Sequence, residues 1–131
     1  MVVSVKWNFN LLIDGGQSLT LADKFDSTAY DKISVTIKKG GHDTTVIVQP
    51  GSIEDVDFFC IKSDQYSIDK DKQLAYKVGE GTTPIILDHA HVLIGNSLVS
   101  LLGEAPTILV FNNTTDKDAN IEIMVGRKAT T

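Results

Sequence analysis

The chain has 131 residues and a formal net charge of −5, and 42% of its residues are hydrophobic. This composition predicts a single domain spanning residues 1–131, and it excludes collagens, disordered tails and disulfide-rich toxins. Because the 12 Lys and Arg residues are scattered among 17 Asp and Glu residues, we expect neither nucleic-acid binding nor attraction to an anionic membrane.

The N-terminal segment alternates apolar and polar residues. Every odd position from Val3 to Ile13 is apolar, including Trp7, whereas most even positions are polar. Because successive side chains of a strand face opposite sides, this pattern predicts a long, half-buried strand with Trp7 packed in the core. Residues 14–16, Asp-Gly-Gly, predict a turn, since glycine adopts positive φ at low cost.

After this turn the sequence alternates between strand patterns and turn signals. Leu19 and Leu21 predict a return strand, whereas residues 22–31 fit either one helical turn or a loop. Residues 39–43, Lys-Gly-Gly-His-Asp, have the composition of a hairpin connection. Residues 96–102 fit either a helical turn or an irregular strand. Further strands are predicted at residues 33–37, 44–49, 58–61, 74–78, 85–94 (as one strand or two), 108–111 and 121–125.

Two of these segments are apolar at every position, namely residues 58–61, Phe-Phe-Cys-Ile, and residues 108–111, Ile-Leu-Val-Phe. Such runs predict central strands that are covered on both faces. Many short strands, turn signals between them and few helical patterns together predict an all-β fold. We expect an antiparallel β-sandwich of jelly-roll-like topology with at most one or two short helical turns.

His89-Ala90-His91 is the sharpest local feature of the sequence. Residues i and i+2 of a strand project from one face, so His89 and His91 are candidates for metal ligands. His42 is a third candidate, and Asp88 is expected on the other face. The pair resembles the motif of the cupins, in which two such histidines, a glutamate a few residues later and a histidine on a later strand bind metal. Here Glu104 lies well beyond the pair and no histidine follows it.

Two interpretations of this pair remain open. One is a cupin-like metal-binding protein that uses His89 and His91. The other is that both histidines lie on a partly exposed or interface-facing strand, flanked on the same face by Leu87 and Leu93.

Other reactive side chains favour a structural interpretation. Aspartates form spaced pairs at 55 and 57, 69 and 71, and 116 and 118, but none follows the EF-hand order, so we expect solvated turns. Cys60 is the only cysteine, which excludes an internal disulfide, and its apolar neighbours favour a buried thiol. The sequence contains no nucleophile elbow, phosphate-binding loop or dinucleotide motif. We therefore predict no enzyme activity, no catalytic residues and no cofactor.

The aromatic residues bear on carbohydrate binding, because sugar-binding modules usually present several rings as a stacking platform. Trp7 is the only tryptophan, and three tyrosines, Tyr30, Tyr66 and Tyr76, accompany it. A carbohydrate- or peptide-binding module is therefore kept as an alternative function, with its small-molecule or glycan ligand unknown.

The length of the first predicted strand suggests self-association. It spans up to about 11 residues, against a usual five or six. A strand that outruns its neighbours leaves unpaired N–H and C=O groups, which native proteins cap or pair with another chain. Small one-domain β-sandwiches are also frequent among phage head, tail and decoration proteins, which is an architectural analogy. Our leading hypothesis is a non-enzymatic structural or assembly protein that forms homo-oligomers, of phage or prophage virion type.

The sequence also indicates a location. No secretory signal pattern opens the chain, and no apolar stretch approaches the roughly 20 residues of a membrane helix. We expect a cytoplasmic or virion-associated protein.

Overall fold

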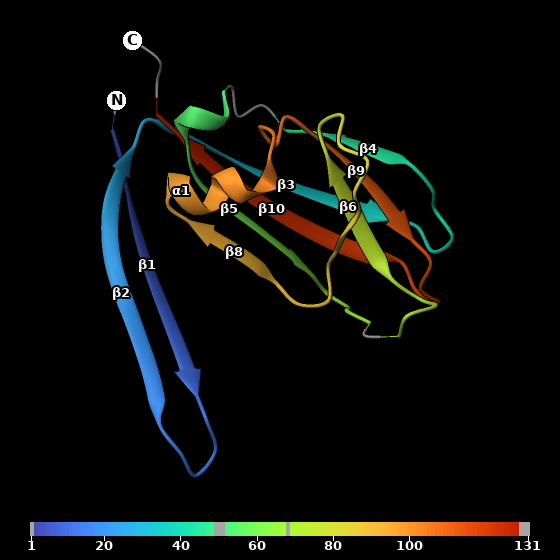
Figure 1. The fold of residues 1–131 in the computed structure, drawn as a ribbon, viewed down its shortest axis with the longest axis horizontal. Helices are drawn as coiled ribbons and strands as arrows, with labels where there is room; N and C mark the ends of the chain where they lie inside the picture. Colours follow the sequence, from blue (N-terminus) through green and yellow to red (C-terminus); the bar gives the residue numbers. More distant parts are fainter. Residues whose placement is uncertain (1, 49–51, 68, 129–131) are drawn as a thin grey trace.

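A computed structural model describes residues 2–48, 52–67 and 69–128. The protein consists of a body, formed by two four-stranded sheets, and a two-stranded arm that projects from one end of the body (Figure 1). Every pairing between strands is antiparallel. The predicted all-β sandwich is confirmed.

The arm contains β1 (Val3–Leu12) and β2 (Ser18–Ser27). The first body sheet has the order β3-β10-β5-β8, with the bounds Ala29–Ile37, Ala119–Arg127, Val56–Ser63 and His91–Ile94. The second has the order β4-β9-β6-β7, with the bounds Thr44–Ile47, Ile108–Asn113, Leu74–Val78 and Ile85–Ile86. The described helical segments are η1 (Ile53–Asp55), α1 (Asn96–Val99) and η2 (Ser100–Leu102).

The core lies between the two body sheets. Alternate residues of each strand point inward, so β10 contributes one side of the core and β9 the other. Aromatic rings fill its centre, where Tyr76 is 5.8 Å from Phe111 and 6.5 Å from Phe59 between ring centroids. The largest fully buried side chains are those of Tyr76, Phe59, Phe111, Ile37, Ile61, Leu74, Leu87, Leu109, Ile121, Ile123, Val48 and Val56.

Most predicted strands are present, and the predicted turn at residues 14–16 joins β1 to β2. The predicted strand at 85–94 is two strands, β7 and β8, and residues 96–102 are helical rather than an irregular strand. Gln49, the predicted end of the strand at 44–49, lies outside the described residues.

Three local expectations are wrong. Residues 22–27 continue strand β2 and residues 29–31 begin β3, so the segment is neither a helical turn nor a loop. Residues 39–43 do not join a hairpin, because β3 pairs with β10 in one sheet and β4 with β9 in the other. The segment 108–111 is not covered on both faces, since Leu109 and Phe111 are buried while Ile108 is 39% exposed.

Candidate interaction surface

The arm is a regular antiparallel hairpin. β1 pairs with β2 along its whole length, from Val3 opposite Ser27 to Leu12 opposite Ser18. The expectation that the first strand outruns its neighbour is therefore wrong, because both strands have 10 residues. Each strand instead has one paired edge and one edge that no described strand covers.

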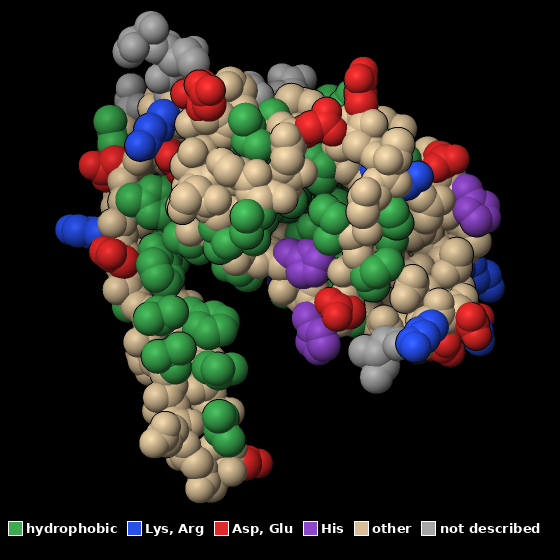
Figure 2. All heavy atoms as spheres, viewed as in Figure 1, with side chains coloured by type: hydrophobic (Ala, Val, Ile, Leu, Met, Phe, Trp, Pro, Cys, Tyr) green, Lys and Arg blue, Asp and Glu red, His purple; other side chains and the backbone are tan. Residues whose placement is uncertain are grey.

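One face of this hairpin is apolar. We call it the arm face; register places on it Val5, Trp7, Phe9, Leu11, Leu19, Leu21, Asp23 and Phe25. Toward the tip, its side chains are open to solvent, with exposed fractions of 44% for Phe9, 49% for Leu11 and 44% for Leu21. Figure 2 shows hydrophobic side chains gathered along the arm and continuing to the body.

This exposure is unusual for the residue types involved. Leu and Phe are among the side chains most often buried in folded proteins, and contiguous exposed apolar patches mark interaction sites. Trp7 is also outside the core: it lies half-buried on the arm face opposite Asp23. The prediction that Trp7 packs in the core is therefore wrong, because no described sheet lies over the face that carries it.

The root of the arm is fixed to the body by an aromatic contact. Phe25 packs edge-on against Phe58 of β5, with ring centroids 5.8 Å apart. Gly126 of β10 lies beneath the Phe58 ring, where an added Cβ would be only 2.0 Å from Phe58 Cε1. A side chain at position 126 would therefore displace the ring that contacts the arm.

Polar contacts also hold the root. The Ser27 hydroxyl is the donor to two acceptors, the Arg127 carbonyl oxygen at 2.8 Å and Asp57 Oδ2 at 3.0 Å. Asp57 is 7% exposed, and Lys128 Nζ lies 3.8 Å from its Oδ1. The buried carboxylate therefore has both a hydroxyl and a cation beside it.

The outer face of the sheet β3-β10-β5-β8 carries a shallow apolar groove next to this root. Its volume is about 330 Å³, and its lining includes Cys60, Val92 and Met124, with Lys32 and Lys62 at its sides. Cys60 is partly exposed, so the predictions that residues 58–61 are covered on both faces and that the Cys60 thiol is buried are wrong at this position. Burial still raises the pKa of the Cys60 thiol, which leaves it neutral at ordinary pH.

The two candidate metal ligands lie near each other but not on one regular strand. β8 begins at His91, and His89 precedes it in a bend. The Asp88 carboxylate lies 3.8 Å from a ring nitrogen of each histidine, so Asp88 is on their side and not on the opposite face. His91 Nδ1 and the Tyr76 hydroxyl are 2.8 Å apart and share a hydrogen bond, and burial raises the pKa of that hydroxyl.

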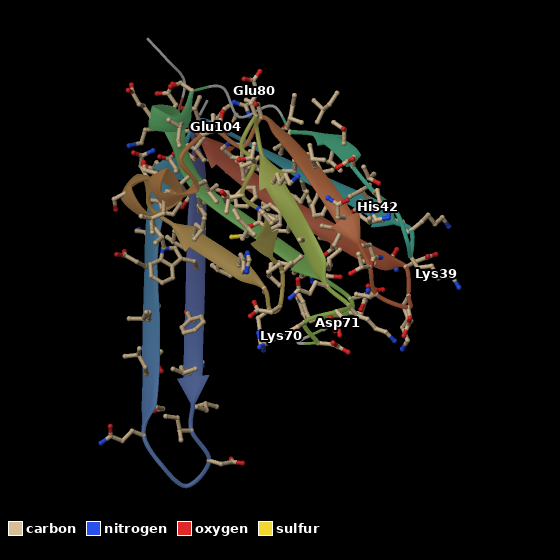
Figure 3. All side chains as sticks on the ribbon, turned by 45° about the vertical axis from the view of Figure 1, so that its right-hand side comes forward. Lys39, His42, Lys70, Asp71, Glu80 and Glu104 are labelled. Atoms are coloured by element: carbon tan, nitrogen blue, oxygen red, sulfur yellow. The ribbon has the colours of Figure 1, made fainter. Side chains whose placement is uncertain are left out.

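The remaining candidates are elsewhere. His42 faces Asn112, with 3.4 Å between Nδ1 and Oδ1, while Glu104 Oε1 accepts a 3.4 Å bond from the Glu80 amide. Figure 3 shows His42 and Glu104 well apart on the body. Within residues 2–48, 52–67 and 69–128, no three His, Cys, Asp or Glu side chains are grouped so as to hold a metal ion.

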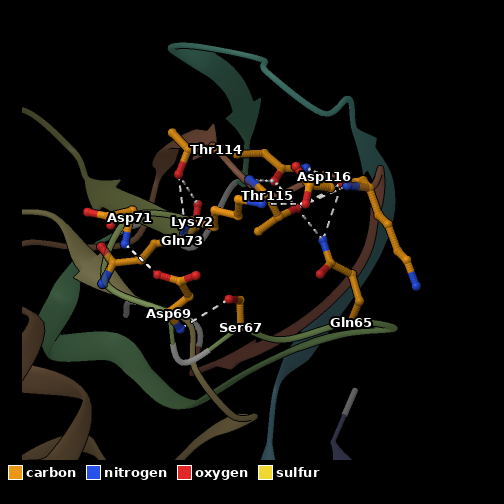
Figure 4. A network of polar contacts seen from close by, with 11 residues as sticks. Gln65, Ser67, Asp69, Asp71, Lys72, Gln73, Thr114, Thr115 and Asp116 are labelled. Carbon is orange, nitrogen blue, oxygen red and sulfur yellow. Dashed lines mark hydrogen bonds and ion pairs between the residues drawn. The ribbon is translucent and has the colours of Figure 1, made fainter.

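The expectation of solvated turns is wrong for Asp57, which is buried within β5, whereas Asp69, Asp71, Asp116 and Asp118 lie exposed between strands. Asp69 Oδ1 accepts a 2.9 Å bond from the Asp71 amide, and Asp116 forms a 2.7 Å ion pair with Lys72 (Figure 4). The hydrogen bond from Lys72 holds the pKa of Asp116 below its usual value. Deeper in the same network, the Gln65 amide donates to Thr115 Oγ1 at 2.8 Å. These groups close one end of the sandwich.

The tyrosines are not arranged as a common platform. Tyr76 is in the core, Tyr66 stacks on His89 at 6.1 Å between centroids, and Tyr30 lies exposed on β3. The Tyr66 hydroxyl accepts a hydrogen bond from the Ser63 amide at 3.0 Å, which further fixes its ring.

The exposure of the arm face was not predicted from the sequence. The alternation in β1 predicts an apolar face, and Leu19 and Leu21 continue it, but Asp23 interrupts the pattern on β2. The turn and the start of the return strand were predicted, and the signal that would have extended this strand to the body is the continuation of the period through Asp23 to Phe25.

A comparison of the sequence with known protein-family models and with curated proteins finds no match. Among the described residues, no helix has the length and apolar character needed to cross a membrane.

Proposed function

We propose that this protein is a non-enzymatic assembly component that associates with copies of itself through the arm, as a subunit of a phage- or prophage-type particle. The observation that carries the proposal is the exposed apolar arm face. Leu19 at 51% and Leu21 at 44% exposure are core-type side chains with no layer above them.

The energetics of the hairpin support this proposal. A two-stranded hairpin is marginally stable by itself in water, and a hydrophobic face gains stability only when another layer covers it. Removing a fully exposed Leu or Phe side chain from water contributes about 1.5–3 kcal/mol, before the entropic cost of association is subtracted. Phe9, Leu11, Leu19 and Leu21 are 44–51% exposed, so covering each one contributes only part of this amount. Several of them must therefore be covered together to offset the cost of association.

The topology of the body is a second support. The first sheet holds β3, β5, β8 and β10, and the second holds β4, β6, β7 and β9. The chain therefore crosses between the sheets after every body strand except β6, which is followed by β7 in the same sheet. We propose that this order, β3-β10-β5-β8 facing β4-β9-β6-β7, is a jelly roll. Jelly rolls are common in viral capsid proteins, although the same architecture occurs in lectins and cupins, so it supports the proposal only as an analogy.

The mechanism proposed is burial of the arm face together with pairing at a strand edge. The outer edges of β1 and β2 carry backbone groups that no described strand pairs, and such edges are templates for a strand of another chain. No chemical step and no cofactor are part of this mechanism.

The test is the mass of the protein in solution, measured by size-exclusion chromatography with light scattering over a concentration series. We expect a mass above 14.2 kDa for the wild type, rising with concentration. Leu21→Asp places a charge on the arm face and is expected to shift the mass to that of the monomer. Ala22→Asp makes the adjacent position acidic on the opposite face and is the matched control, expected to assemble like the wild type.

A wild type that stays monomeric at high micromolar concentration would contradict the proposal. Equal loss of assembly in Leu21→Asp and Ala22→Asp would also contradict it, because it would show that net charge, and not the arm face, controls association.

A further inference from the structure

We propose that the arm of one copy docks on the groove at the outer face of the sheet β3-β10-β5-β8 of a second copy, with Asp23 of the arm beside Lys32 of the acceptor. This inference rests on the proposed self-association and names the surface that receives the arm. Its acceptor residues are Lys32, Cys60, Val92 and Met124.

The root of the arm already displays this type of packing. Phe25 of the arm face lies against Phe58, an outward-facing residue of β5 in the same sheet as the groove. Beyond Phe25 the arm projects away from its own body, so the distal arm face does not contact its own groove (Figure 1). The arm of a second copy is therefore needed to cover the groove and to extend along the sheet the packing that Phe25 makes on Phe58.

The groove offers a matching surface. Register aligns Lys32, Met124, Cys60 and Val92 in one row across the four strands. Met124 is 36% and Val92 49% exposed, although both are apolar. A flat hairpin and a sheet pack face to face at about 10 Å, which brings apolar side chains of both layers into contact.

The charges of the two surfaces are complementary. Asp23 is the only charged residue of the arm face, and it has no ion pair within the described part of the chain. Glu122 also lines the groove, where it forms a 3.1 Å ion pair with Lys62, and Lys32 is near enough to help lower its pKa. Among the described residues Lys32 forms no ion pair of its own, so of the two lysines it is the one left to pair with an incoming carboxylate. Lys32 is thus the cation that an incoming Asp23 carboxylate meets, and desolvated pairs of this kind fix the register of an interface.

Cross-linking tests the contact directly, because Cys60 is the only cysteine of the chain and lines the groove. We would replace Leu21 by Cys and treat the assembled protein with a short bismaleimide. The expected product is a covalent dimer joined from Cys60 of one copy to position 21 of the other, identified by peptide mass spectrometry. The control is Ala22→Cys, on the opposite face of the arm, which is expected to give little of that product.

The outcomes separate this inference from the proposed function. Two results would overturn the groove as acceptor while leaving self-association intact. One is an assembled protein whose cross-links join only position 21 of two arms. The other is an assembled protein in which Cys60 is alkylated as fast as in the Leu21→Asp monomer. A protein that does not assemble at all would overturn both.

A charge exchange tests the named ion pair. Asp23→Lys places two cations together, and we expect it to raise the dissociation constant of assembly at least about tenfold. Adding Lys32→Glu restores opposite charges and is expected to recover most of that loss. Lys62→Glu in place of Lys32→Glu is the control and should not rescue assembly. Equal rescue by both substitutions, or by neither, would overturn the pairing of Asp23 with Lys32.

Discussion

The arm and the body have the same alternating sequence pattern, but the apolar face is exposed in the arm and buried in the body. In β10, Ile121, Ile123 and Val125 alternate with the outward-facing Glu122 and Met124 and are buried by the facing sheet. In β1, Phe9 and Leu11 alternate in the same way, yet they are 44% and 49% exposed. The difference is whether a second layer lies above the face, and in the arm no described part of the chain supplies that layer. A period of two therefore identifies an apolar face without identifying what covers it.

The largest difference between the two regions is expected in the free energy of unfolding when a large apolar side chain is shortened. Ile123→Ala should lower the free energy of unfolding by about 2–5 kcal/mol, because it opens a cavity between the sheets. Leu11→Ala should change the unfolding free energy of the monomer by no more than about 0.5 kcal/mol, since Leu11 is exposed there. Urea denaturation at a concentration where both variants are monomeric measures both values. Similar losses for the two variants would show that the arm face is covered within one chain.

The joint between arm and body is expected to give an intermediate effect. Gly126→Ala forces the Phe58 ring away from the sheet and should destabilise the protein by about 1–3 kcal/mol. Phe58→Leu removes the ring atoms that an added Cβ would meet. The double variant is therefore expected to be more stable than the sum of the two single losses predicts, measured as a double-mutant cycle. Strict additivity would contradict a contact between Gly126 and the ring.

The smallest effect concerns the charged turns of the body. Asp116 has a lowered pKa because of its hydrogen bond with Lys72, so the pair stabilises the fold above the unfolded pKa of Asp, about 3.9. That contribution is lost as pH falls through the folded pKa. The melting temperature of Asp116→Asn should accordingly fall less between pH 5 and pH 2 than that of the wild type. Identical slopes would show that the exposed pair adds nothing measurable.

The strands of the body were predictable because alternation and turn residues agree there. Ile33, Val35 and Ile37 belong to β3 as their spacing predicts. The segment 22–31 was not predictable in the same way, because Asp23 and Asp26 are unfavourable in strands and conceal the period that pairing with β1 imposes. Local propensity was overridden by the partner strand.

Features that depend on long-range placement were beyond local patterns. The composition of residues 39–43 indicates a turn but not that β4 joins the opposite sheet. His89 and His91 have the spacing of ligands on one strand, yet β8 begins only at His91, because the preceding residues bend. Cys60 was expected in a strand buried on both faces. It instead lines a groove on the outer face of the sheet, and this groove exists only where the four strands lie side by side.

The account depends most on the arm face being covered by another copy, and Trp7 reports on that directly. It is the only tryptophan and lies on the arm face. We expect its fluorescence emission to move to shorter wavelength over the same concentration range in which the mass rises, and to stay unshifted in Leu21→Asp. An emission maximum that does not change while the wild type assembles would contradict the account, because the arm face would then remain in water.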